Sequence, residues 1–109
     1  MCTVFTGSVA FDLLLGDVRS LKQKRSLVRP LVAELRRKYD VSAAEAGHLD
    51  LHRRALVGVA VVSADRAHCV DVLDACERLV AGHPEMDLLS ARRQLVKGTD
   101  DEVMTREDE

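Results

Sequence analysis

The chain is poor in aromatic residues and contains no tryptophan. One tyrosine and two phenylalanines are its only aromatic side chains among 109 residues. Proteins that read single-stranded RNA stack bases on exposed aromatic rings. Phe5 and Phe11 share a parity within one alternating segment, so we expect both on the same buried face. The composition argues against base stacking and leaves shape and phosphate contacts as the means of any RNA binding.

Long hydrophobic runs are also missing. The longest apolar run, residues 55–62, is far shorter than the roughly 20 residues that span a bilayer. The first residues, MCTVFTGS, carry no basic segment of the kind that begins a secretory leader. We therefore expect neither export nor membrane anchoring.

The three cysteines do not form a disulfide framework. Cys69 and Cys76 lie on one helix face, about 10 Å apart along the axis, which is too far for a disulfide. Unpaired cysteines are typical of a reducing compartment, where buried thiols behave as small hydrophobic groups. We therefore expect a cytoplasmic protein.

Charge is distributed unevenly along a chain whose formal net charge is −2. Residues 97–109 carry two positive and six negative side chains, which leaves 14 positive against 12 negative residues before them. With 47% hydrophobic and 31% charged residues, the composition fits one globular domain. We predict a single domain over residues 1–96 and an acidic, flexible tail over residues 97–109.

The hydrophobic pattern predicts four strands and two helices. Alternation over residues 3–15 indicates a first strand, which Gly16 ends. Helical spacing follows over residues 21–39, with Pro30 as the expected position of a kink. The remaining elements are a short strand at 41–46, a valine-rich strand at 56–63 that is apolar on both faces, a helix that begins after Ser63 or Asp65 and ends at Gly82, and a strand at 85–96.

This order of elements predicts an α+β fold, a ferredoxin-like βαββαβ sandwich. Two helices would cover one face of a four-stranded antiparallel sheet and leave the other face for a ligand, a partner or a second subunit. Acylphosphatases share this topology and use a catalytic asparagine, a residue type that is absent from this sequence. No serine or cysteine has an evident activating base either, so we expect a non-enzymatic protein.

The run RSLKQKR, residues 19–25, joins a helix start to a cluster of positive charge. Ser20 followed by Gln23 is a capping-box pattern, which fixes where the helix begins and which way its cations point. Cations along one side of a helix can follow a phosphate backbone. The predicted RNA- or phosphate-binding residues are Lys22, Lys24, Arg25, Arg29 and Arg36.

The segment HLDLH is a candidate metal ligand set. In an extended segment, His48, Asp50 and His52 would share one face and offer two imidazoles and a carboxylate to zinc. Such a site needs supporting groups that the sequence does not identify, and polar residues in a connection usually bond to its backbone. We therefore assign no metal site and expect no cofactor.

Three stretches in combination resemble the YlxP-like family of small bacterial proteins. They are RSLKQKR at the first helix, VSAAEAGHLD across the short strand and its turn, and ALVGVAVVSAD before the second helix. The resemblance covers roughly residues 3–96. The matching motif positions are Ser20, Leu21, Lys22, Lys24 and Arg25 at the helix start, and Glu45, Gly47 and Asp50 at the turn; His52 stands where related sequences often carry tryptophan.

The resemblance implies a ferredoxin-like fold, a cytoplasmic location and no catalytic role for these positions. It also implies genes that lie among those for translation initiation, ribosome maturation and transcript elongation. Ribosomal RNA or a ribosome-associated protein is the partner that this context favours.

Two hypotheses follow. The first is a non-enzymatic accessory protein, ribosome-associated or RNA-binding, that uses the basic surface of the first helix. The alternative is a protein-interaction module that forms a homodimer through the sheet and does not contact nucleic acid. In that case Val59 or Val61 would point outward from the valine-rich strand.

Overall fold

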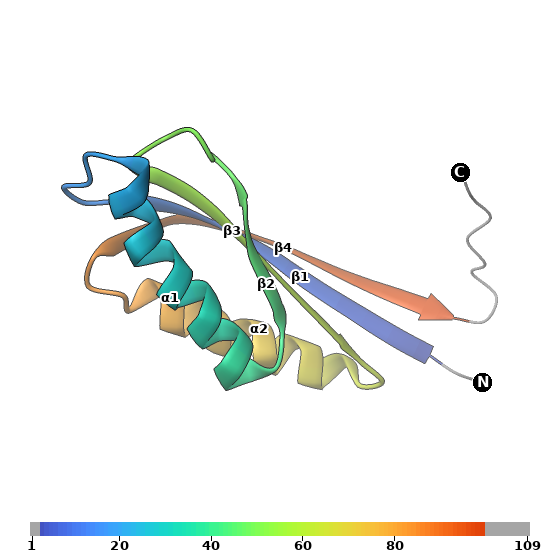
Figure 1. Ribbon diagram of the computed structural model, residues 1–109. Helices are drawn as coiled ribbons and strands as arrows, with labels where there is room; N and C mark the ends of the chain where they lie inside the picture. Colours follow the sequence, from blue (N-terminus) through green and yellow to red (C-terminus); the bar gives the residue numbers. More distant parts are fainter. Residues whose placement is uncertain (1–2, 100–109) are drawn as a thin grey trace, which may run out of the picture.

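The structure, a computed structural model, describes residues 3–99. The strands form one sheet in the order β2-β3-β1-β4, and each neighbouring pair is antiparallel. Both helices lie on one face of this sheet (Figure 1), which confirms the predicted α+β, ferredoxin-like βαββαβ fold. The elements are β1 (Thr3–Leu15), α1 (Leu21–Tyr39), β2 (Ser42–Gly47), β3 (Arg54–Ser63), α2 (Arg66–Ala81) and β4 (Met86–Thr99).

The elements differ from the predicted ones mainly at the ends of strands. β3 begins at Arg54, and β4 runs to Thr99, which takes it into the segment predicted as a tail. β1 and β4 continue together beyond the helices as a two-stranded ribbon, with Thr3 opposite Thr99. Residues 100–109, which make up the rest of that segment, lie outside the described residues, as does Cys2.

The two faces of the sheet have different compositions. On β1, Phe11, Leu13 and Leu15 are fully buried beneath the helices, as the alternation predicts. On β3, Val59 is paired with Val9 of β1 and shares this buried face, together with Val57 and Val61. The prediction that Val59 or Val61 points outward is therefore wrong. The residues of β3 on the open face are Leu56, Gly58, Ala60 and Val62.

The start of α1 follows from local hydrogen bonding. Ser20 has extended backbone, and its hydroxyl oxygen accepts a 3.1 Å hydrogen bond from the backbone N–H of Gln23. The Gln23 side chain in turn accepts one from the Arg19 backbone N–H at 2.8 Å. Pro30 lies inside the helix on its exposed side, and the helix continues past it to Tyr39. The predicted cap is confirmed, and it fixes the direction of every side chain on α1.

Of the two predicted cap residues, Ser63 and Asp65, the second caps α2: the Asp65 carboxylate accepts from the Ala67 N–H, and the helix ends before Gly82. Cys69 and Cys76 are buried on its inner side as free thiols, which the sequence predicts. Burial raises the pKa of the Cys76 thiol. Among residues 3–99, no helix has the length and apolarity needed to cross a membrane.

Candidate nucleic-acid interface

A row of cations projects from the side of α1 that faces away from the core. Lys22, Arg25 and Arg29 are exposed, and none of them forms an ion pair with another of residues 3–99. Further along the helix, Arg36 is also exposed, and its Nε donates a 2.9 Å hydrogen bond to the Ala43 carbonyl oxygen of β2. This bond holds the guanidinium at the sheet edge. We call Lys22, Arg25, Arg29 and Arg36 the cationic row.

Two shallow depressions border the cationic row. The first, of about 520 Å³, has Lys22, Ser26 and Pro30 in its walls. The second, of about 460 Å³, lies between α1 and β2, and Arg36 is in its wall. Arg25 and Arg29 border both depressions, so they stand as a ridge between them.

Lys24, predicted as a phosphate contact, does not belong to this surface. Its side chain is 1% exposed, and its Nζ lies 2.7 Å from Glu45 Oε2 of β2. The same Nζ donates a 2.7 Å hydrogen bond to the His48 carbonyl oxygen. At about 100° per residue, Lys24 falls on the side of α1 that carries Val28 and Leu31. The prediction for Lys24 is wrong because this lysine anchors the helix to the sheet.

The turn after β2 is shaped to receive the Lys24 ammonium group. A Cβ on Gly47 would lie 2.9 Å from Leu56 Cδ2, so the backbone passes close to β3. His48 then adopts a left-handed conformation with φ 56, and its carbonyl oxygen accepts from both Lys24 Nζ and the Leu51 N–H. Of the turn positions singled out in the sequence, Glu45 contacts α1 through Lys24, and Gly47 lets the backbone approach Leu56 of β3, while Asp50 is exposed.

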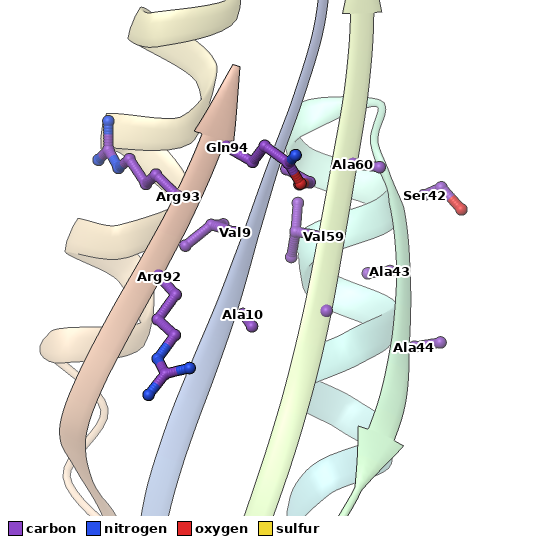
Figure 2. Close-up of a pocket in the computed structure, with 12 residues that line it drawn as sticks. Val9, Ala10, Ser42, Ala43, Ala44, Val59, Ala60, Arg92, Arg93 and Gln94 are labelled. Atoms are coloured by element: carbon purple, nitrogen blue, oxygen red, sulfur yellow. The ribbon is translucent and has the colours of Figure 1, made fainter. Parts of the chain in front are cut away.

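The open face of the sheet, opposite the helices, is a second candidate surface. A hollow of about 750 Å³ lies at its centre, and Figure 2 shows the residues that line it. Arg92 and Gln94 border it on β4, whereas Arg93 points to α2, where its Nη2 lies 2.7 Å from Asp74 Oδ1. The small side chains across the hollow are Ser8, Ala10, Ser42, Ala44 and Ala60, with Gly58 among them. The sequence does not predict this hollow, although the alternation of β1 predicts Ser8 and Ala10 on this face.

The open face carries few unpaired charges. Asp12 accepts hydrogen bonds from Arg54 Nη2 at 2.8 and 2.7 Å, so these opposite charges neutralise each other. Hydrogen bonds from Arg54 hold the pKa of Asp12 below its usual value, against the effect of burial. At the other end of the face, Val4, Val62 and Val96 are exposed by 49%, 68% and 49%. This end of the open face is apolar, whereas the exposed side of α1 is cationic.

Comparison with known proteins places the chain in a family. Residues 6–93 match the family described as "Protein of unknown function (DUF503)". The chain belongs to this family. It is 26% identical over 88 residues to the "Uncharacterized protein YlxP" of Bacillus subtilis (strain 168), which covers 81% of this chain and 96% of that protein. The YlxP-like resemblance found in the sequence is thereby confirmed.

One solved structure similar to this DUF503 protein is the "De novo designed protein Foldit4". Its TM-score is 0.49 at 10% sequence identity, over 89% of this chain and 98% of that chain.

The HLDLH segment of this DUF503 protein is a turn, so its side chains do not alternate as in a strand. His48 Nε2 lies 3.4 Å from Asp12 Oδ1 on β1, whereas Asp50 and His52 are exposed in the turn itself. Within residues 3–99, no group of three or more histidine, cysteine, aspartate or glutamate side chains is placed to hold a metal ion. His48 instead ties the turn to the Asp12–Arg54 pair.

The two phenylalanines lie on the buried face of β1, where the sequence predicts them. Phe11 is fully buried, and Phe5 packs against the same core on the helix side of β1. Tyr39, at the end of α1, is half-buried against this core as well. The open sheet face therefore carries none of the three aromatic rings of the chain.

Proposed function

We propose that this protein is a non-enzymatic accessory protein that binds RNA through the cationic row of α1. The observation that supports this function is the exposure of Lys22, Arg25 and Arg29 without an acidic partner among residues 3–99. Such side chains bind phosphate and release its counterions, which gives affinity without base recognition. Arg36, held by Ala43, adds a cation whose position is fixed before binding.

The partner that we propose is ribosomal RNA, or a ribosome-associated protein bound together with it, in the cytoplasm. The YlxP-like resemblance supports this partner through the genes that accompany the family. The charge of the cationic row also supports ribosomal RNA as the partner, because a protein that contacts only phosphate needs an RNA surface that presents many phosphates at once. No residue is given a catalytic role.

The experiment that tests this function compares two charge-matched variants. In the first, Lys22, Arg25 and Arg29 are each replaced by glutamine, which removes three charges from α1 and keeps helix propensity. In the second, Arg66, Arg78 and Lys97, which are exposed on α2 and β4, are replaced in the same way. Binding to purified ribosomal RNA is measured over a range of salt concentrations.

We expect the α1 variant to lose most of its affinity at low salt. The slope of log affinity against log salt should flatten by about 2 to 3, because three phosphate contacts are lost. The α2 and β4 variant should keep the slope of the wild type. Equal losses in the two variants would show a general charge effect and contradict a site on α1.

A second candidate function is a dimeric protein-interaction module. The charge-poor open face, with Val4, Val62 and Val96 exposed at one end, favours it because the cores of protein interfaces are depleted in charge. The test is the molar mass in solution of Val62→Arg beside Leu51→Arg, a control in the turn whose native side chain is also exposed. A dimer that only Val62→Arg dissociates supports this function, and a monomeric wild type contradicts it.

A further inference from the structure

The shape of the cationic surface indicates which class of RNA it fits. Single-stranded and duplex RNA require different features of a protein surface. Single strands are bound by stacking their bases on aromatic side chains, whereas duplex RNA is bound by its shape and by contacts to the phosphates and sugars that border its minor groove.

The requirement of single strands is not met on either candidate surface. Phe5 and Phe11 face the helices, and Tyr39 packs against the core. On the open face, the central positions are occupied by alanine, serine and glycine, which offer no ring to a base. A single strand on this protein would therefore be held by phosphate contacts alone.

The cationic row meets the requirement of a duplex in its length. Lys22 and Arg36 are separated by about 21 Å along the helix axis, at about 1.5 Å per residue. Arg25 and Arg29 lie between them, so positive charge continues along α1 rather than gathering at one point. A surface of this length can contact several phosphates of a regular helix at once.

The cross-section of the surface also fits a duplex. The ridge formed by Arg25 and Arg29 has a depression on each side, one with Lys22 and the other with Arg36 in its wall. A duplex groove has the complementary shape, because it is a hollow with one row of phosphates along each side. The ridge can enter the groove while each phosphate row lies in one depression.

One acidic residue, Glu45, borders the second depression and would repel a phosphate row if its charge were unpaired. Lys24 Nζ lies 2.7 Å from Glu45 Oε2 and neutralises it from beneath. The buried lysine therefore supports the cationic row without contacting the ligand.

We propose that the α1 surface recognises duplex RNA, with the Arg25–Arg29 ridge in the minor groove and one phosphate row in each depression. This inference rests on the proposed function, since it names the class of RNA that the cationic row binds. Lys22 and Arg36 then contact opposite strands, whereas Arg25 and Arg29 stand between the strands. Replacing a cation on either side should weaken duplex binding.

The test is fluorescence anisotropy with three labelled probes: a 20-base-pair RNA duplex, one of its strands in a sequence without self-pairing, and a DNA duplex of the same sequence. We expect the wild type to bind the RNA duplex at least tenfold more tightly than the single strand and more tightly than the DNA duplex. Lys22→Gln and Arg36→Gln should each weaken duplex binding several-fold, and Arg66→Gln, on α2, should not. Circular dichroism and thermal melting establish that each variant is folded.

The possible results separate this inference from the proposed function. Equal or tighter binding of the single strand would overturn the duplex assignment and leave RNA binding intact. Equal binding of the DNA duplex would overturn the assignment to RNA. Failure to bind any of the probes would overturn both proposals.

Discussion

Lys22 and Lys24 have the same side chain and lie on the same turn of α1, yet their surroundings are opposite. Lys22 is exposed and makes no ion pair with another described residue. Lys24 is 1% exposed and contacts Glu45 and the His48 carbonyl oxygen. The difference arises from about 200° of rotation around the helix. The exposed lysine belongs to the proposed binding surface, and the buried lysine holds the helix to the sheet.

The comparison shows that residue type alone does not define a binding surface. The direction of each side chain is fixed by the Ser20 cap, because the cap determines where the helical rotation starts. Lys24 shares its side of α1 with Val28, Leu31 and Leu35, which are buried. A lysine in that position must find a buried partner, and Glu45 provides it.

The largest expected effect is on stability, and it should distinguish the two lysines. Lys24→Met leaves Glu45 without its partner and should lower the free energy of unfolding by about 3 kcal/mol. Lys22→Met, on the exposed side, should change it by less than about 0.5 kcal/mol. Chemical denaturation of both variants measures the difference. Similar values for the two would contradict the assignment of Lys24 as an anchor.

A double variant sharpens this prediction. Replacing Lys24 by Met and Glu45 by Leu removes both charges, so no buried charge is left unpaired, and stability should recover by at least half of what Lys24→Met loses. A double variant that stays as unstable as Lys24→Met would indicate that the His48 carbonyl, rather than Glu45, is the partner that matters.

A smaller effect is expected at the cap that orients both lysines. Ser20→Ala removes the acceptor of the Gln23 N–H and should lower the free energy of unfolding by about 1 kcal/mol. Ser26→Ala is the matched control, because within residues 3–99 the exposed Ser26 hydroxyl donates only to the Gln23 carbonyl oxygen of its own helix. Thermal or chemical denaturation measures both, and equal losses would contradict the capping role of Ser20.

The smallest expected effect on stability concerns the Asp12–Arg54 ion pair on the open face. Arg54 holds the pKa of Asp12 below the usual 3.8, so this carboxylate stabilises the folded state above the pKa of the unfolded chain. The stabilisation should be lost as the pH falls through the lower folded-state pKa, and it should amount to less than about 1 kcal/mol.

Denaturation of the wild type and of Asp12→Asn between about pH 6 and pH 2 measures this contribution. The difference in unfolding free energy between the two proteins should shrink as the pH falls. A difference that does not change with pH would show that the carboxylate charge of Asp12 has no stabilising role.

The sequence predicted the order of elements, the Ser20 cap and the buried face of β1, and it narrowed the second cap to Ser63 or Asp65, because local patterns determine these features. Capping residues and alternating hydrophobic positions act over a few residues and can be read without knowing the fold. The outward direction of β3 was not predicted correctly, since Val57, Val59 and Val61 alternate with residues that are also small or apolar. Only the pairing of Val59 with Val9 determines the face.

The candidate site was predicted in part for a similar reason. Helical spacing indicates the exposure of Lys22, Arg25, Arg29 and Arg36, and the same spacing places Lys24 with the apolar residues, so the charge of Lys24 alone does not indicate a surface position. The turn at His48 could not be predicted. Its left-handed backbone and its contact with Asp12 depend on residues that are distant in the sequence.

The most direct test of RNA binding by the cationic row is sedimentation of the full-length protein in cell lysate through sucrose gradients at low and at high salt. Immunodetection across the gradient locates the wild type and the variant with glutamine at positions 22, 25 and 29. We expect the wild type to migrate with a ribosomal subunit at low salt and to leave it at high salt, and the variant to stay in the top fractions under both conditions. A wild type confined to the top fractions at both salt concentrations, or a variant that migrates as the wild type does, would contradict RNA binding through α1.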